Sequence, residues 1–265
     1  MNRIDVTFKD LRKNGKKAFI AYLTCGDPDL KTTAECIKVI SDNGADIIEL
    51  GVPFSDPLAD GPTIQVASQR ALKNNVSLAA IIKMVSKIRS KIDTPLVLMT
   101  YYNPVFHYDI RNFVRDAKKA GVDGVIIPDL PPEEASQIEM FARKLELATI
   151  YFASPTSSEQ RKKIAISHSR GFIYYVSTTG VTGKRTNLPD SIKKDVKNLQ
   201  KITSKPICVG FGISTPAQAK KIASFADGII VGSAIVEKID TAKSKREMIK
   251  SLGAFIKQMA KAVSI

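Results

Sequence analysis

The chain has 265 residues, of which 44% are hydrophobic and 25% charged, a composition that can bury a sizeable core without disulfides or a structural metal. Its formal net charge of +14 raises the question of a nucleic-acid partner, but lysine and arginine are spread along the whole chain and no nucleic-acid-binding motif accompanies them. We therefore expect no nucleic-acid partner. No apolar run approaches the roughly 20 residues needed to span a bilayer, so we expect no membrane-spanning segment either.

Short β-branched runs alternate with longer amphipathic segments along the chain. The first segment, Thr7–Asn14, is predicted to be an extra helix. Eight strands are then predicted, at Ala18–Thr24, Ile47–Gly51, Leu96–Thr100, Gly124–Pro128, Thr149–Ala153, Phe172–Ser177, Ile207–Gly210 and Gly228–Val231. Helical patterns lie between them, among them Leu30–Asn43, Ala71–Ser90, Asp109–Ala120 and Glu133–Leu145. Strands that alternate with helices of about 10–15 residues are typical of βαβ units and a parallel sheet.

Eight such units in a chain of near ~250 residues predict an α/β fold, a (β/α)8 TIM barrel formed as a single domain by residues 1–265. A short helix, Ala234–Ile239, is expected after the eighth strand. The alternative is a doubly wound open sheet, which more often has about five to seven strands and a dinucleotide fingerprint. Gly210 and Gly212 supply only the first two glycines of that fingerprint, and they follow the seventh predicted strand instead of the first.

Glu49 is a carboxylate inside an apolar strand, between Ile48 and Leu50. An ionised carboxylate is costly in such a place unless it is paired, and otherwise its pKa rises until it takes up a proton. A carboxyl group that gains and loses a proton is a candidate general acid or base. Asp60 is a second candidate, in a following loop rich in proline and glycine. The plainer alternatives are that Glu49 reaches solvent or a lysine, and that Asp60 only shapes an Asp-Gly turn.

Glycines follow the last two predicted strands, whose ends belong to the rim that carries the active site of a barrel. Gly210 and Gly212 follow the seventh strand, and Gly232 and Ser233 follow the eighth. Glycine lets backbone N–H groups approach a ligand, and the N-terminus of the short helix near Ser233 favours an anion. We therefore expect a phosphate site at these two loops, although glycine is also common in βα loops that bind nothing.

Neither a metal site nor a disulfide framework is indicated by the sequence. Cys25, Cys36 and Cys208 are odd in number and fit no zinc or redox spacing, so we expect free, buried thiols. His107 and His168 are too few and too isolated for the usual metal sites. The first residues lack the apolar stretch of a secretory signal, so we expect a cytoplasmic protein.

A resemblance to the tryptophan synthase alpha chain family runs in order over nearly the whole chain. Its most specific part is the stretch IELGVPFSDPLADGP at residues 48–62. The further matching segments are Met99–Pro104, Gly124–Pro131, Tyr174–Ser177, Gly180–Gly183, Gly210–Ile213 and Gly232–Val236. Three places depart from the family pattern: Tyr22 stands where Phe is familiar, Thr100 where an apolar residue is usual, and Thr178-Thr179 where an Arg-Ser pair is often found.

The resemblance implies a lyase of tryptophan biosynthesis that cleaves indole-3-glycerol phosphate to indole and glyceraldehyde 3-phosphate in a retro-aldol reaction. It also implies a beta-chain partner, in an alpha2-beta2 heterotetramer, that uses pyridoxal phosphate to join indole to serine. The alpha chain itself would need no cofactor and no metal.

The resemblance also assigns roles to residues. Glu49 would move protons, and Asp60 would accept a hydrogen bond from the indole N–H. The phosphate would be held by Gly183, Phe211, Gly212, Gly232 and Ser233. The indole and glycerol pocket would include Tyr22, Ile64, Thr100, Tyr102, Tyr174 and Thr182. The beta chain would contact Asp56, Pro57, Asn103, Phe106 and Pro131.

Two other functions remain as alternatives. Another phosphate-binding barrel enzyme, such as a sugar-phosphate epimerase or isomerase, would share the two glycine loops but should lack the segment from Glu49 to Asp60. A regulatory subunit that mainly activates a partner would tolerate the loss of Glu49 or Asp60, and both are present.

Overall fold

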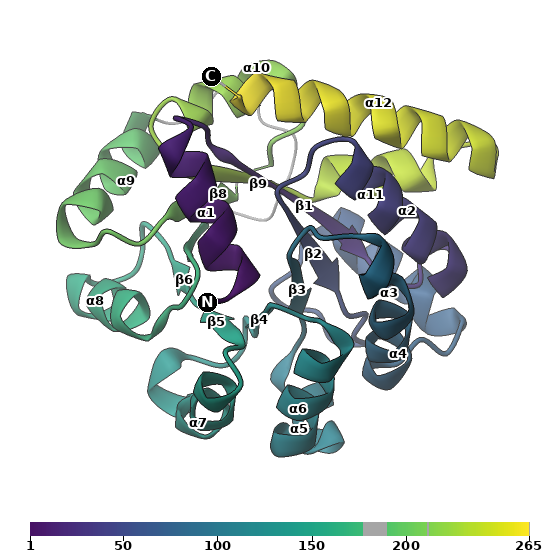
Figure 1. The fold of residues 1–265 in the computed structure, drawn as a ribbon, viewed down its shortest axis with the longest axis horizontal. Coiled ribbons are helices and arrows are strands. Elements are labelled where there is room, and N and C mark those ends of the chain that lie inside the picture. Colours follow the sequence, from purple (N-terminus) through teal and green to yellow (C-terminus); the bar gives the residue numbers. More distant parts are fainter. Residues whose placement is uncertain (177–189, 211, 265) are drawn as a thin grey trace.

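The computed structural model describes residues 1–176, 190–210 and 212–264. Within this part of the chain, a parallel sheet lies inside a ring of helices (Figure 1). The strands are β1 (Ala18–Thr24), β2 (Ile47–Gly51), β3 (Leu96–Met99), β4 (Gly124–Ile126), β5 (Ala148–Ile150), β6 (Phe152–Ala153), β7 (Ile173–Val176), β8 (Ile207–Gly210) and β9 (Gly228–Val231). Their order in the sheet is β5-β4-β3-β2-β1-β9-β8-β7-β6. The predicted (β/α)8 barrel is confirmed.

Tyr151 divides the fifth predicted strand into two short strands, β5 and β6. β5 pairs with β4, whereas β6 pairs with β7. The Tyr151 backbone N–H donates to Ser169 Oγ at 3.1 Å, and its carbonyl accepts from Tyr174 N at 3.1 Å. One segment therefore carries the sheet from its first half to its second, which closes the barrel.

The helices alternate with the strands as expected. They are α1 (Arg3–Lys13), α2 (Leu30–Asp42), α3 (Pro62–Lys73), α4 (Leu78–Ile88), α5 (Tyr102–Tyr108), α6 (Ile110–Ala120), α7 (Ser136–Lys144), α8 (Glu159–His168), α9 (Asp190–Ile202), α10 (Pro216–Ala223), α11 (Ser233–Asp240) and α12 (Lys245–Val263), with 3₁₀ turns η1 (Arg89–Lys91) and η2 (Pro132–Glu134). The extra helix is α1, and the short helix after the last strand is α11.

The predicted helix Ala71–Ser90 is correct over α4 but wrong as one continuous helix. Two helices, α3 and α4, stand in its place, and α3 begins nine residues earlier, at Pro62. Proline suits the first position of a helix because its missing N–H would have no partner there. Asn75 adopts a φ of 52°, which ends α3 because left-handed backbone cannot continue a helix. The loop after β2 (residues 52–61) therefore runs directly into a helix, and this fixes its far end.

Every second strand residue points into the barrel, as the pleat of a strand requires. The buried interior cluster takes Ala18 and Ile20 from β1, Ile47 from β2, Val97 from β3, Ile126 from β4, Ala148 and Ile150 from β5, Cys208 from β8 and Ile230 from β9. Ile4 and Phe8 of α1 belong to the same cluster, and Figure 1 shows α1 lying across this end of the barrel. The end where the strands begin is thus plugged.

Three aspartates stand directly before strands at this plugged end. Asp46 accepts from Phe19 N at 2.8 Å, Asp123 from Leu96 N at 3.0 Å, and Asp227 from Ile207 N at 3.0 Å. Each one ties the start of its strand to the neighbouring strand, so these carboxylates stabilise the register.

Among the described residues, no helix is long and apolar enough to cross a membrane.

Candidate active site

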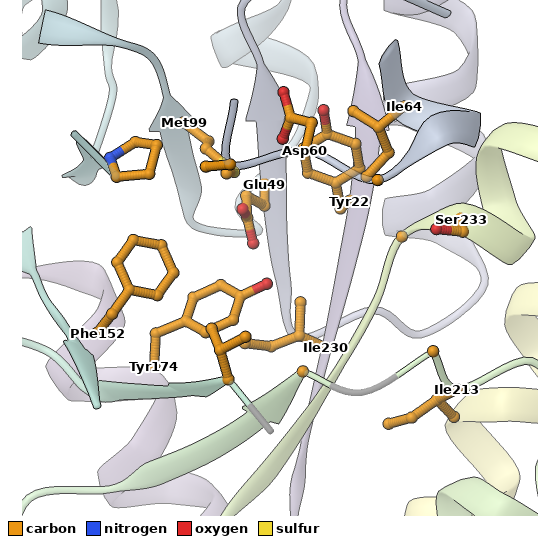
Figure 2. A pocket seen from close by; sticks show the side chains of 17 residues that line it. Tyr22, Glu49, Asp60, Ile64, Met99, Phe152, Tyr174, Ile213, Ile230 and Ser233 are labelled. Carbon is orange, nitrogen blue, oxygen red and sulfur yellow. The ribbon is translucent and has the colours of Figure 1, made fainter. Parts of the chain in front are cut away.

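A cavity of about 360 Å³ opens at the end of the barrel where the strands finish. Figure 2 shows the side chains that line it. Its described lining residues are Tyr22, Glu49, Ala59, Asp60, Gly61, Ile64, Met99, Pro128, Phe152, Tyr174, Val176, Gly210, Gly212, Ile213, Ile230, Gly232 and Ser233. Active sites of such barrels lie at this end. The cavity is therefore the candidate active site.

Glu49 projects into the cavity from β2 and is only 1% exposed. Neither of its carboxylate oxygens has a hydrogen-bond partner among the described residues. Burial raises the pKa of Glu49 to about 8, and the nearby Asp60 adds to the rise because two negative charges repel. The group therefore carries a proton at neutral pH, unlike an ordinary glutamate.

Asp60 enters the cavity from the loop after β2 and is 8% exposed. Tyr101 Oη donates to its Oδ2 at 3.2 Å and accepts from Ala59 N at 2.9 Å. Burial raises the pKa of Asp60 to about 6, and the Tyr101 hydrogen bond limits this rise. Asp60 is therefore mostly ionised at neutral pH, whereas Glu49 is mostly protonated.

One side of the cavity is apolar and aromatic. The rings of Phe152 and Tyr174 lie 4.8 Å apart between centroids, and Met99 completes this side. A side chain at Gly210 would come within 2.7 Å of the Tyr174 ring, so only glycine lets that ring lie where it does. Figure 2 shows Met99 and Phe152 on one side of the two carboxylates and Ser233 on the other.

The opposite side is formed by backbone. Gly212 has a φ of 38°, a conformation that favours glycine, and Gly232 precedes the first residue of α11, Ser233. The first N–H groups of a helix lack partners within the helix and attract an anion. This side can hold a phosphate group without a basic side chain.

A family model described as tryptophan synthase alpha chain matches residues 8–264. The chain belongs to the tryptophan synthase alpha chain family. A relative of that name from Thermoanaerobacter sp. (strain X514) is 48% identical over 259 residues, 98% of each chain. Another, from Geotalea daltonii, is 50% identical over 245 residues, 92% of this chain and 93% of that one.

Solved structures agree with this family. Tryptophan synthase subunit alpha from Legionella pneumophila str. Paris superposes with a TM-score of 0.92 at 38% identity, over 99% of this chain and 98% of that chain. A chain of Mycobacterium tuberculosis tryptophan synthase superposes with a TM-score of 0.92 at 36% identity, over 100% of this chain and 99% of that chain.

The structure brings most of the expected site residues together. Those that line the cavity are Glu49, Asp60, Tyr22, Ile64, Tyr174, Gly212, Gly232 and Ser233. Gly183, Phe211, Thr182 and the Thr178-Thr179 departure lie outside the described residues.

Thr100 and Tyr102 do not line the cavity. Thr100 is one residue out of phase with the inward-facing Met99, and its Oγ1 donates to the Tyr101 carbonyl at 3.3 Å. Tyr102 begins α5, and its ring lies 6.0 Å from that of Phe106, on the rim. The places expected for Thr100 and Tyr102 are taken by their neighbours: Met99 lines the cavity, and Tyr101 donates a hydrogen bond to Asp60.

Several lining residues were not expected from the sequence, among them Met99, Pro128, Phe152, Val176 and Ile230. A signal for them was available. Ile230 is itself part of the interior cluster, and each of the other four lies two residues beyond an inward-facing residue, so continuing the alternation of buried residues to the strand ends identifies them. Tyr101 continues the same alternation two residues beyond Met99, but it contacts Asp60 and does not line the cavity. The described residues contain no group of three or more His, Cys, Asp or Glu side chains that could hold a metal, and all three cysteines are free and buried.

The rim beside the cavity holds the residues expected to contact a partner. Asp56, Asn103 and Phe106 are exposed, whereas Pro57 and Pro131 are half-buried. Leu58, in the loop after β2, is 85% exposed, and Phe106, on α5, is 62% exposed. Large exposed apolar side chains beside a candidate site make this rim a candidate protein-binding surface.

Proposed function

We propose that this chain is the alpha subunit of tryptophan synthase and acts as a lyase, cleaving indole-3-glycerol phosphate to indole and glyceraldehyde 3-phosphate. The observation that carries the proposal is one cavity in which two buried carboxyl groups lie between an apolar side and a backbone anion site. Full-length relatives that bear the family name support it.

The reaction needs two proton movements. A proton must reach C3 of the indole ring, and the hydroxyl proton of the neighbouring glycerol carbon must leave as the carbon–carbon bond breaks. The bonding electrons go to the indole ring, and the former alcohol carbon becomes the aldehyde of glyceraldehyde 3-phosphate. The number of protons is balanced, so one acid–base group can serve both steps.

Glu49 is suited to this exchange. With a pKa of about 8 it holds a proton at neutral pH and can release it to carbon, then take up the proton of the hydroxyl. Its oxygens have no partner among the described residues, so substrate need not displace one. We assign proton transfer to Glu49.

Asp60 is suited to stabilise charge. Protonation at C3 makes the ring nitrogen positive, and an ionised carboxylate that accepts the indole N–H offsets this charge. The Tyr101 hydroxyl favours the ionised form of Asp60 and holds its carboxylate on the cavity side. We assign the charge-stabilising role to Asp60.

The two sides of the cavity orient the substrate between these groups. The indole ring would lie against Tyr22, Ile64 and Tyr174 together with Met99 and Phe152, and Thr182 belongs to the proposed pocket. The phosphate would bind the N–H groups of Gly212, Gly232 and Ser233, with Gly183 and Phe211 as further proposed contacts.

The exposed rim around Leu58 and Phe106 is the proposed surface for a beta chain, with Asp56, Pro57, Asn103 and Pro131 as contacts. The loop after β2 carries both Asp60 and this surface, so partner binding can alter the placement of Asp60. We place the complex in the cytoplasm as an alpha2-beta2 heterotetramer, in which the beta chain consumes the indole.

The test is release of indole from indole-3-glycerol phosphate by the purified chain, with and without a beta chain. We expect cleavage by the chain alone and faster cleavage in the complex. A chain that binds phosphate but releases no indole under either condition would contradict the assignment and favour another phosphate-binding barrel enzyme.

A further inference from the structure

Arg70 lies on α3 and connects three elements outside the cavity. Its Nε and Nη2 donate to Asp27 Oδ1 and Oδ2 at 2.8 and 2.7 Å, a two-point pairing. Its Nη1 lies 3.0 Å from Asp240 Oδ1. Asp27 belongs to the loop after β1, and Asp240 is the last residue of α11. One guanidinium therefore joins a helix, a loop and the end of a second helix.

The two joined helices carry the two halves of the candidate site at their other ends. α3 begins two residues after Asp60, and the Gln65 side chain on its first turn donates to the Asp60 carbonyl at 2.9 Å. α11 begins at Ser233, on the anion side. Between these ends, Ala67 of α3 and Val236 of α11 pack with Tyr22 in one buried cluster.

The pairing with Asp27 differs from an ordinary surface contact because one of its charges is buried. The Asp27 side chain is 5% exposed, so its charge needs a close cation. Asp240 lies in the last turn of α11, where a negative charge opposes the helix dipole, and the guanidinium offsets this. Only arginine offers a planar fork with a further N–H group for a second carboxylate.

We propose that Arg70 is a positioning residue for the reaction: by holding α3 and α11 together, it sets the separation between Asp60 and the anion site at Ser233. This inference rests on the proposed function. Arg70 does not line the cavity, so it acts through the two helices and not on the substrate. A change in this separation should slow the reaction of a substrate that contacts both Asp60 and the anion site. It should not alter the binding of a ligand that contacts only one of them.

Asp240→Asn is the sharpest variant. It removes the negative charge from the link to α11, leaving at most a neutral amide oxygen there, and keeps the two-point pairing of Arg70 with Asp27. The Asp240 side chain is 47% exposed, so the fold should tolerate the change. The matched control is Glu35→Gln, which removes the Lys245 pair between α12 and α2 at similar exposure, 47% and 42%.

We expect Asp240→Asn to lower kcat/KM for indole-3-glycerol phosphate by about fivefold, mostly through kcat, because a small misplacement of reacting groups slows chemistry. The dissociation constants of inorganic phosphate and of indole, each measured alone, should stay within about twofold of the wild type. Asp240→Glu should restore most of the activity, and Glu35→Gln should leave it unchanged.

Arg70→Lys is the second variant, because it keeps a cation near Asp27 but loses the fork. It should reduce kcat at least as much as Asp240→Asn. Full turnover in both variants would overturn the proposal, as would weaker binding of phosphate or indole alone, since this would make the contact merely structural. A wild-type chain that releases no indole would instead contradict the proposed function.

Discussion

At the end of the barrel where the strands begin, Asp46, Asp123 and Asp227 each accept a backbone N–H from a neighbouring strand. At the end where the strands finish, Glu49 has no such partner among the described residues, and Asp60 has only the Tyr101 hydroxyl. Carboxyl groups that are paired stabilise the fold, and those left with free lone pairs in a cavity can act on a substrate.

A raised pKa alone does not separate the two ends. Burial raises the pKa of Asp46 to about 6, the same value as for Asp60, even though Asp46 has a backbone partner. Access to a hollow does not separate them either, because Asp46 borders one beside α1. The difference lies in partners and neighbours: the Asp46 carboxylate is held by the Phe19 N–H, whereas Asp60 lines the same cavity as the unpartnered Glu49.

The largest effect is expected at Glu49. Glu49→Gln keeps the shape of the side chain but removes its titratable proton. The rate of cleavage should therefore fall by about 10²–10⁴-fold. The variant should remain folded, since no described residue pairs with the carboxylate. Indole release in a steady-state assay measures the loss, and near-normal turnover would exclude proton transfer by Glu49.

Asp60→Asn should lose about 10²–10³-fold in kcat, because the charge opposite the indole nitrogen disappears. In the wild type, activity should also fall below about pH 6 as Asp60 takes up a proton, and above about pH 8 as Glu49 loses one. A pH–rate profile checks both limbs. Retained activity in the variant would leave Asp60 as a residue that only shapes its loop.

At the plugged end the same kind of change should affect stability and not chemistry. Asp123 is 1% exposed, and its carboxylate also pairs with Arg3 at 2.9 Å and Arg89 at 3.5 Å. Asp123→Asn should lower the free energy of unfolding by about 3 kcal/mol, because the largely buried Arg89 loses its counter-charge.

Urea unfolding measures this loss, with Asp42→Asn as the control in an exposed pair with Lys38, where about 0.5 kcal/mol or less is expected. The turnover of the folded Asp123→Asn variant should match the wild type. A kinetic defect without a stability loss would mean that the two ends are not divided as described.

The smallest effect on basal chemistry is expected at Asp56, which is exposed on the loop that carries Asp60. Asp56→Ala should leave cleavage by the isolated chain largely unchanged, but weaken beta-chain binding and reduce the gain in cleavage that the partner induces. Titration with a beta chain measures both. Unchanged affinity and unchanged activation would remove Asp56 from the proposed interface.

The plugged end and the open end also differ in how well the sequence predicts them. The strand positions followed from alternation of apolar runs with helices, because a barrel strand is buried along its whole length. The break at Tyr151 could not be predicted, since it depends on which strands pair on either side. Helix α3 was missed because its start at Pro62 lies inside a loop-like run of proline and glycine.

Within the site, Glu49 and Asp60 could be identified from sequence because a charge in an apolar strand, followed by a specific loop, is unusual. Thr100 and Tyr102 were expected one position away from Met99 and Tyr101. A shift of one residue reverses the side of the sheet on which a side chain lies. The register that decides it pairs Met99 with Ile126 and is a property of the folded sheet.

The most direct test of the account is the pKa of Glu49, measured by carboxyl carbon NMR across pH 4–10 with Glu49→Gln used to assign the signal. Because burial without a partner disfavours the charged form, we predict a midpoint near 8, well above an ordinary glutamate. A midpoint between about 4 and 5 would show an ionised Glu49 at neutral pH. That result would contradict the assignment of an unpartnered, proton-bearing carboxyl group to the open end of the barrel.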